Sequence, residues 1–305
     1  MLIPVPARKD SMAHPHVLTT KELALAIGVS ESSIKRWADD GTLHASRTAG
    51  GHRRILLPEA IRFVRETRAA VVHPEILGLP DVAAAVRDST GPADDAERLY
   101  AYLVAGEAVQ ARGMVQSLYL GGSSVAAIVD GPLRAAMHRI GELWQHEPAG
   151  VFLEHRATDI SIQALNQLRL TLPDAGGQPV AVGGAPEGDP YLLPSLAAAT
   201  CLAAEGFDTV NLGPDTPYAT LEEAARRLRP VLIWLSVSGA QPSERVAAAT
   251  AALASALQPL GTSVIVGGRA FRAQPGAPPN LHAGTSMAEL VAYARGVRSG
   301  AVTRP

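Results

Sequence analysis

Basic side chains gather near the N-terminus at a spacing that suits the binding of phosphate. The candidates are Ser32, Ser33, Lys35 and Arg36 in a first group, then Arg47, and then His52, Arg53 and Arg54 after a pair of glycines. Ammonium and guanidinium groups donate charge-assisted hydrogen bonds to phosphate oxygens, and arginine also binds base edges in the major groove. No acidic residue lies between Gly41 and Pro58, although the formal net charge of the whole chain is −2. This local basic patch predicts contacts with double-stranded DNA.

The elements around these residues must present them on a polar surface. Thr19-Thr20 offers helix N-caps, Gly28 interrupts the apolar pattern that follows, and Ser30 is placed to cap a second helix. In that second helix Trp37 faces the core while the serines and cations face outward, as a recognition helix requires. Gly50-Gly51 permits a tight turn with positive φ, from which the three basic residues after it would project as a tip. The pattern predicts a helix-turn-helix with a basic wing.

The Lys35-Arg36-Trp37 run and the Gly-Gly-His-Arg-Arg wing together resemble the MerR family of winged-helix transcription factors. The resemblance covers residues 16–70. An isolated Lys-Arg pair would more often belong to the solvated face of an ordinary helix pair. Helix, turn, helix and glycine wing in this order make the combined motif specific. The resemblance implies that residues 16–70 bind DNA.

Composition bounds the rest of the architecture. A chain of 305 residues with 47% hydrophobic residues fits two or three domains. The one cysteine, Cys201, excludes an internal disulfide framework and a cysteine-based zinc site, and its apolar surroundings predict a buried side chain. No apolar run is long enough to span a membrane, and the start of the chain lacks the apolar core of a signal peptide. We therefore expect a cytoplasmic protein with no membrane partner.

Hydrophobic periodicity divides the chain into five segments. We expect disorder at 1–15, the DNA-binding module at 16–70, a linker at 71–93 with a short helix Leu79–Arg87, a four-helix bundle at 94–174 and an α/β domain at 178–300. In the last segment short β-branched runs alternate with helical patterns. This alternation predicts a doubly wound parallel sheet of the Rossmann-like, flavodoxin-like kind. The expected fold class is thus a winged helix-turn-helix followed by an all-α bundle and an α/β domain.

Ligands of doubly wound sheets bind beyond the carboxyl ends of the strands. Those ends are rich in glycine, serine and aspartate here, and they lie at Gly183–Tyr191, Gly213–Pro217, Ser236–Gln241 and Gly267–Arg269. In the bundle, Glu154-His155 follows Trp144 after nine residues. This spacing offers an aromatic plate, a carboxylate acceptor and an imidazole able to reach a metal. Taken alone, it is explained more simply by a core tryptophan beside two polar surface residues.

The order of wing module, helix bundle and small α/β domain resembles the CarH-type regulators, in which MerR-like DNA binding is joined to a cobalamin-binding module. The family's Trp-x9-Glu-His pattern corresponds to Trp144, Glu154 and His155, which implies contact with the upper face and adenosyl group of cobalamin. In the α/β domain the resemblance implies cofactor binding by Gly213, Asp215, Ser236, Ser238, Gly267 and Gly268. Glycines there would let the backbone approach a flat macrocycle, and serines would hydrogen-bond its nucleotide tail.

The family's lower-ligand motif, Glu-x-Asp-x-His-x-x-Gly, is altered in this chain. Glu187 and Asp189 are kept, but Tyr191 replaces the histidine and Pro194 replaces the glycine. Tyrosine is a poor ligand for cobalt and a known kind of ligand for ferric haem. Three interpretations stay open: cobalamin bound without a protein lower ligand, another tetrapyrrole such as haem or a bilin, or a domain that has lost its ligand. The candidate metal ligands are Tyr191 and His155.

The resemblance implies a transcription regulator, expected to be a repressor, and not an enzyme. Ligand state would control assembly into a homo-oligomer, a dimer or a tetramer, and thereby DNA affinity. With adenosylcobalamin, light would be the trigger by the same resemblance, and the protein would be a photoreceptor. Two alternatives remain: a regulator that works without a cofactor, and a corrinoid-dependent methyltransferase subunit. The Tyr191 replacement, the wing module and the lack of a fused substrate barrel disfavour the enzyme.

Overall fold

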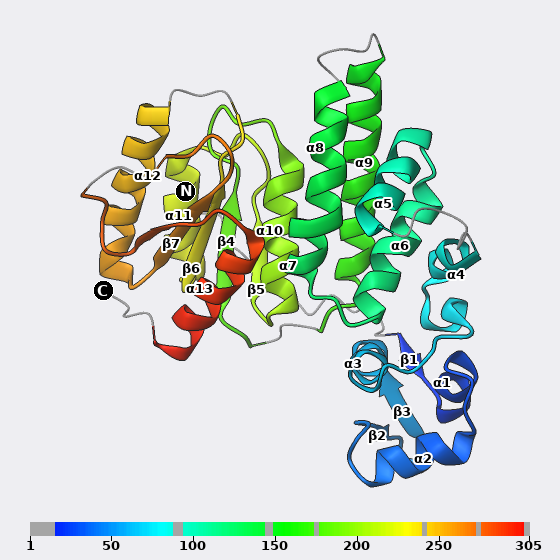
Figure 1. Cartoon of the computed structure of the whole chain (residues 1–305). Helices are drawn as coiled ribbons and strands as arrows, with labels where there is room; N and C mark the ends of the chain where they lie inside the picture. The colour runs from blue at the N-terminus through cyan, green and yellow to red at the C-terminus, as the bar shows by residue number, and fades with distance from the viewer. Residues whose placement is uncertain are drawn as a thin grey trace, which may run out of the picture. The chain divides into compact units, whose positions relative to one another are not determined.

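The computed structural model describes residues 16–87, 94–143, 149–173, 177–239, 243–272 and 276–301. The chain divides into two units, Met1–Pro80 and Asp81–Pro305. The first unit holds the helix-turn-helix, and the second holds the bundle and the parallel sheet (Figure 1). Two of our predictions, disorder at 1–15 and a ligand contact by Trp144, fall outside the described residues.

Two capped helices open the first unit. α1 (Thr20–Ala26) begins at a capping box, in which the Glu22 amide donates to Thr19 Oγ1 at 3.1 Å and the Thr19 amide donates to Glu22 Oε2 at 2.8 Å. α2 (Glu31–Asp39) begins after Ser30, whose hydroxyl oxygen accepts a backbone amide of the first turn. The N-caps expected at Thr19 and Ser30 are therefore confirmed.

A small antiparallel sheet of order β1-β3-β2 forms the wing. Its strands are β1 (Val17–Leu18), β2 (Ser46–Arg47) and β3 (Arg53–Leu56), and α3 (Leu57–Thr67) and a 3-10 turn (Pro74–Leu77) follow. The turn between β2 and β3 has a φ of 78° at Gly51, as the glycine pair predicted. The expected tip is wrong in one respect. Arg53 and Arg54 belong to β3, because they pair with Arg47 and Ser46 of β2.

Helices make up the first part of the second unit. They are α4 (Pro80–Arg87), α5 (Asp95–Ala105), α6 (Ala108–Leu120), α7 (Val125–Ile128), a π-helical turn (Val129–Leu133), α8 (Arg134–Leu143) and α9 (Gly150–Arg169). Since α7, the π-helical turn and α8 follow one another directly, they form one interrupted helix of a four-helix bundle. The interruption centres on Gly131, whose φ of −92° and ψ of −105° are not helical, and on Pro132. No helix in the described part of the chain could cross a membrane.

Five parallel strands in the order β5-β4-β6-β7-β8 form the α/β domain. The strands are β4 (Val180–Gly184), β5 (Asp208–Asn211), β6 (Leu232–Ser236), β7 (Ser263–Gly267) and β8 (Leu281–Ala283). The helices are α10 (Leu192–Ala204), α11 (Tyr218–Leu228), α12 (Ser243–Leu257) with a 3-10 turn (Gln258–Leu260), and α13 (Met287–Ser299). This is the flavodoxin-like strand order, so the predicted fold class is confirmed.

Helices cover both faces of the sheet. α11 and α12 pack on one face through Leu221 and Val246, and α10 and α13 pack on the other through Leu202 and Leu290. α10 also contacts α7 and α9, so it stands between the sheet and the bundle (Figure 1). Within α10, burial raises the pKa of the Cys201 thiol, which is consequently an unreactive packing residue, as its apolar surroundings predicted.

Candidate functional site

The outer face of α2 presents the first group of predicted DNA contacts. Ser32, Lys35 and Arg36 are exposed, and Ser33 is half-buried. The hydroxyl oxygens of both serines lie within 2.9 Å of Ser30 Oγ, so they take part in the cap of the helix. Lys35 Nζ lies 3.0 Å from a carboxylate oxygen of Glu31. Arg36 forms no salt bridge with any described residue, which leaves its guanidinium open to a partner.

Asp39, at the end of α2, ties the wing to that helix. Its carboxylate pairs with Arg53 and lies 3.6 Å from Arg47 Nη2. The Arg53 side chain is accordingly only 18% exposed, whereas that of Arg47 is 62% exposed. Arg54 is half-buried in β3, and His52 is exposed in the turn. Arg47 and His52 are thus the more accessible of the predicted wing residues.

Two contacts hold α2 and the wing against α3. The rings of Trp37 and Phe63 pack with their centroids 5.1 Å apart. Glu59 accepts the His44 amide at 2.7 Å and Arg62 Nε at 2.7 Å. Burial acts to raise the pKa of Glu59, but the bonds from Arg62 and the His44 amide outweigh burial and hold that pKa below its ordinary value.

A cavity of about 1020 Å³ lies between the bundle and the carboxyl ends of β6, β7 and β8. Its lining comes from the π-helical turn and α8, from α10, from the strand ends and from the start of α13. Apolar side chains in the lining include Trp234, which is 1% exposed, Ile265 and Leu290. Of the predicted cofactor-binding residues, Ser236 and the Gly267-Gly268 pair line this space. The cavity therefore occupies the sheet edge at which ligands of such folds bind.

A second cavity, of about 780 Å³, adjoins the first, since Met137, His138 and Arg269 line both. It brings together three residues predicted from the sequence: Glu154 and His155 of α9 and Tyr191 of the loop between β4 and α10. Glu154 Oε2 lies 3.6 Å from His155 Nε2, and the His155 side chain is largely exposed. The bundle and the α/β domain thus contribute polar groups to one continuous cleft.

Tyr191 lines the second cavity and is accessible to solvent. The residue is 41% exposed, and the guanidinium carbon of Arg269 lies 5.8 Å from the centroid of its ring. This is the range of a cation–π contact. The phenol is therefore accessible from the cleft, with a cation beside its ring.

Asp189, two residues earlier, is buried behind the cavity wall. It is 1% exposed, and its Oδ2 accepts the amides of Ser238 and Gly239 at 2.5 and 2.8 Å. Its Oδ1 accepts the Tyr191 amide at 3.1 Å. These bonds fasten the loop after β4 to the loop after β6, so Asp189 positions the cavity wall instead of forming it.

Five predicted cofactor-binding residues line neither of these two cavities: Glu187, Asp189, Gly213, Asp215 and Ser238. Most of them support the loops. Asp215 Oδ1 accepts the Gly188 amide at 2.6 Å, and the Gly213 carbonyl accepts the Ala185 amide at 2.9 Å. Glu187 is exposed. The carboxylates of Asp189 and Asp215 bond to backbone amides of the loops, so in this structure they hold the loops in place. Ligand contact by these five residues stays a prediction.

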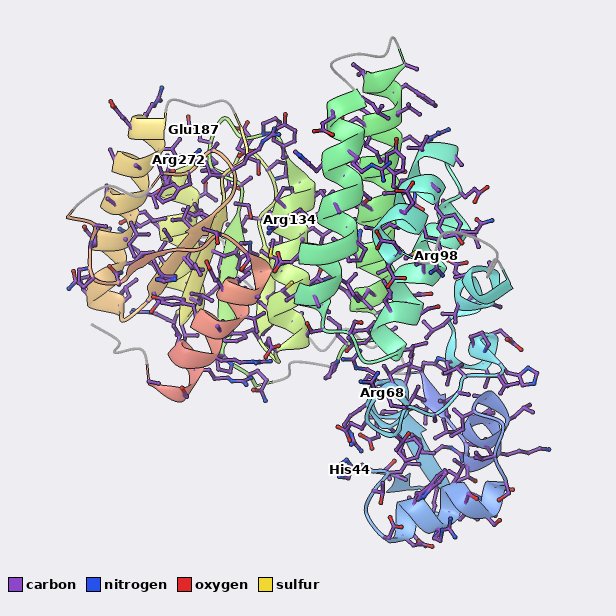
Figure 2. All side chains as sticks on the ribbon, viewed as in Figure 1. His44, Arg68, Arg98, Arg134, Glu187 and Arg272 are labelled. Carbon is purple, nitrogen blue, oxygen red and sulfur yellow. The ribbon has the colours of Figure 1, made fainter. Side chains whose placement is uncertain are left out.

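Asp130, in the π-helical turn, joins the bundle to the last helix. Its Oδ1 accepts the Met287 amide at 3.0 Å, its Oδ2 accepts the Ala288 amide at 2.9 Å, and Arg134 Nη2 lies 2.7 Å from Oδ1. The first amides of α13 are thereby satisfied by a carboxylate 157 positions earlier in the chain. Figure 2 labels Arg134 at the start of α8, beside α10.

Many residues that line the two cavities were not predicted from the sequence, among them Arg134, Met137, His138 and Arg272. Arg269 lies in the strand end Gly267–Arg269 that the sequence predicted to face a ligand, although it was not among the predicted cofactor-binding residues. No sequence signal pointed to the residues of α8, because only tertiary packing brings that helix over the end of β7. Figure 2 labels Arg272 in the loop after β7.

Two family models match the chain. Residues 17–59 match a helix-turn-helix domain, which covers α1, α2 and the wing. Residues 95–169 match a B12 binding domain, which covers the bundle from α5 to α9. The two matches fall in the two different units of the chain.

The chain is 27% identical over 299 residues to the HTH-type transcriptional repressor CarA of Myxococcus xanthus, a match that covers 94% of this chain and 99% of that protein. Among solved structures, the Methanosarcina barkeri monomethylamine corrinoid protein has a TM-score of 0.49 and 17% identity, with 65% of this chain and 96% of that chain covered. A methanol:cobalamin methyltransferase complex from the same organism has a TM-score of 0.35 and 18% identity, with 77% and 88% covered. These two likenesses are too distant to support an argument about ligands. The resemblance to CarH-type regulators is confirmed by the other matches: the chain joins a helix-turn-helix domain to a B12-binding-type bundle, and it is similar to a repressor over nearly its whole length.

Proposed function

We propose that the protein is a DNA-binding transcription repressor whose DNA affinity is controlled by a cobalamin-type ligand. The observation that carries the proposal is the continuous cleft between the B12-binding-type bundle and the carboxyl edge of the sheet, in a chain that also holds a helix-turn-helix. The curated relative is a repressor, which agrees with our prediction of a regulator that is not an enzyme.

The DNA contacts of this proposal come from α2 and the wing. Lys35 and Arg36 would enter the major groove with α2, and Arg47 and His52 would meet the phosphate backbone from the wing. Their exposure supports these roles. Arg53, held by Asp39, would keep the wing at a fixed distance from α2.

The residues of the cleft fit a large ligand with an apolar body and polar edges. Trp234 and Ile265 supply apolar contact, and Ser236 and Glu154 supply hydrogen-bonding groups. When bound, a corrinoid would supply a cobalt centre and absorption of visible light. Both imidazoles of the cleft, His138 and His155, come from bundle helices. The α/β side offers Tyr191 in their place, so we propose binding without an imidazole from that domain.

The phenol of Tyr191 suits ferric haem better than cobalt. The match of the bundle to a B12 binding domain nevertheless favours cobalamin, and nothing in the comparisons favours haem or a bilin. Adenosylcobalamin would add a response to light, and a homo-oligomer, a dimer or a tetramer, would place several helix-turn-helix units on one DNA. These finer parts of the proposal depend on the resemblance to CarH-type proteins.

Removal of exposed cations from α2 and the wing tests the DNA-binding part. Duplexes that bind the parent protein would first be selected from a random pool. Arg36→Ala and Arg47→Ala should then each weaken binding, by about 1–3 kcal/mol where the lost contact is to a base. Arg227→Ala, on α11 in the second unit, removes the same charge and serves as the control. If the gel-shift affinities of both Arg36→Ala and Arg47→Ala lie within twofold of the parent's, the assignment of α2 and the wing as the DNA-binding surface is refuted.

A further inference from the structure

The larger cavity has more cationic than anionic side chains in its lining. Arg134, Arg269 and Arg272 line it, and Asp130 is the only carboxylate among its lining residues in the described part of the chain. All three arginines are exposed, and cations beside an apolar cavity favour a ligand that carries negative charge. Which of the arginines is available to such a ligand depends on their present partners.

The negative charge of Asp130 already compensates the positive charge of one arginine and of one helix N-terminus. Its two oxygens accept the amides of Met287 and Ala288, and Arg134 Nη2 lies 2.7 Å from one of them. The carboxylate therefore compensates Arg134 and the positive N-terminal end of α13. Asp130 does not compensate the charges of Arg269 and Arg272. These two arginines form no salt bridge with any residue that the structure describes.

Backbone carbonyls hold both of these arginines in place. Arg269 Nε donates to the Ser238 carbonyl at 3.1 Å, and Arg272 Nη1 donates to the carbonyls of Arg269 and Phe271 at 3.0 and 2.9 Å. A guanidinium has five N–H donors in a fixed fork, so each side chain keeps donors for another acceptor. Carbonyl oxygens fix a guanidinium without cancelling its charge.

The remaining lining defines the rest of the ligand. Trp234, Ile265 and Leu290 present apolar surface, and the cavity has room for a large ring system at about 1020 Å³. A free inorganic anion would leave this surface unused. The ligand should accordingly combine an extensive apolar body with an anionic group.

We propose that Arg269 and Arg272 form an anion-recognition site for a phosphate or carboxylate carried by the ligand of this cavity. The inference rests on the proposed function in taking the cavity as the ligand site. Cobalamin carries a phosphodiester in its nucleotide tail, cobinamide lacks that tail, and haem carries two propionate carboxylates. These three molecules separate the two sources of negative charge.

The test compares the full-length parent with Arg269→Gln, Arg272→Gln and the double variant in absorbance titrations with hydroxocobalamin, cobinamide and haemin. Arg227→Gln is the matched control, because Arg227 pairs with Glu223 on α11 and lines neither described cavity. A second readout is thermal stabilisation by inorganic pyrophosphate, which needs no tetrapyrrole to bind. Hydroxocobalamin affinity should fall about tenfold or more in the double variant, as expected for lost charge-assisted bonds. Cobinamide affinity should change less than threefold.

The outcomes separate the two proposals. If the parent binds hydroxocobalamin and the double variant binds it equally well, the anion site is refuted while the proposed ligand stands. If the parent binds no corrinoid but binds haemin or is stabilised by pyrophosphate, and these effects vanish in the double variant, the anion site stands and cobalamin is refuted. If neither the tetrapyrroles nor pyrophosphate distinguish the double variant from the parent, the inference is wrong.

Discussion

Tyr191 occupies the position on which the chemistry of the ligand depends. The resemblance to CarH-type proteins implies an imidazole there, and the structure has an accessible phenol in the lining of the second cavity. Asp189, which the motif keeps, bonds through both carboxylate oxygens to backbone amides, including that of Tyr191. The loop is thus held in place independently of the side chain at position 191. This position can consequently be exchanged without loss of the loop geometry.

Restoring the histidine tests whether its replacement by Tyr191 weakened the binding of cobalamin. Tyr191→His should tighten the binding of hydroxocobalamin about tenfold or more, because imidazole coordinates cobalt where phenol does not. The measurement is an absorbance titration, in which coordination also shifts the visible bands. Tyr191→Phe should bind cobalamin as the parent does. If the histidine variant binds no better than the parent, Pro194 or the cavity wall excludes the corrin, and a ferric haem spectrum lost in Tyr191→Phe would single out haem.

Two of the carboxylates that join elements of this protein are Glu59 and Asp130. In the first unit, Glu59 of α3 accepts the His44 amide and Arg62, and so fixes the segment that leads into the wing. In the second unit, Asp130 of the π-helical turn caps α13. A π-helical turn beside a ligand cavity is a common arrangement at functional sites. Both carboxylates can be tested by amide substitution.

Glu59→Gln should make the first unit less stable at neutral pH. The folded-state pKa of Glu59 lies below the ordinary value of 4.5. A depressed pKa stabilises the folded state above the unfolded pKa, and this contribution is lost as the pH falls through the folded pKa. Thermal unfolding of the full chain should therefore show a gap between parent and variant at pH 7 that closes below pH 4.5. Glu66→Gln, whose side chain is more exposed, should show a smaller gap. A gap that widens toward acid would contradict the role of Glu59.

Asp130→Asn should destabilise the second unit by about 1–3 kcal/mol, because it removes a charged acceptor from two amides at a helix N-terminus. Urea unfolding of the full chain can be followed by the fluorescence of Trp234, which is buried beside the cavity, once Trp37 and Trp144 are replaced by phenylalanine in every protein compared. Glu222→Gln on α11 is a control of equal charge change. A midpoint for Asp130→Asn that matches the control would show that the cap contributes nothing to stability.

For the molecule as a whole, local sequence signals predicted most of the fold. Thr19 and Ser30 start helices because their side chains satisfy free amides, and Gly51 turns the wing because glycine tolerates positive φ. Alternating strand and helix patterns predicted the parallel sheet. By contrast, the prediction that Arg53 projects from the tip of the wing was wrong. Arg53 lies in β3, because the length of that strand depends on pairing with β2 and not on the glycine pair alone.

The candidate site was less predictable than the fold. Glu154, His155 and Tyr191 were found because a motif relates them, and the structure brings them to one cavity. Asp189 belongs to the same motif, yet its carboxylate is turned inward to backbone amides that no sequence pattern reveals. Arg272 was missed because its place beside the cavity depends on the path of the loop after β7, in which the carbonyls of Arg269 and Phe271 hold its guanidinium.

Control of DNA binding by a cobalamin-type ligand in the cleft is tested most directly by the affinity of the full chain for a selected duplex, measured with and without adenosylcobalamin. The visible spectrum is recorded alongside, in the dark and after illumination. We expect a saturable spectral change and a change in DNA affinity of about fivefold or more on ligand binding, in the range of typical coupling between sites. An unchanged spectrum together with an unchanged DNA affinity, for adenosylcobalamin and hydroxocobalamin alike, would contradict it.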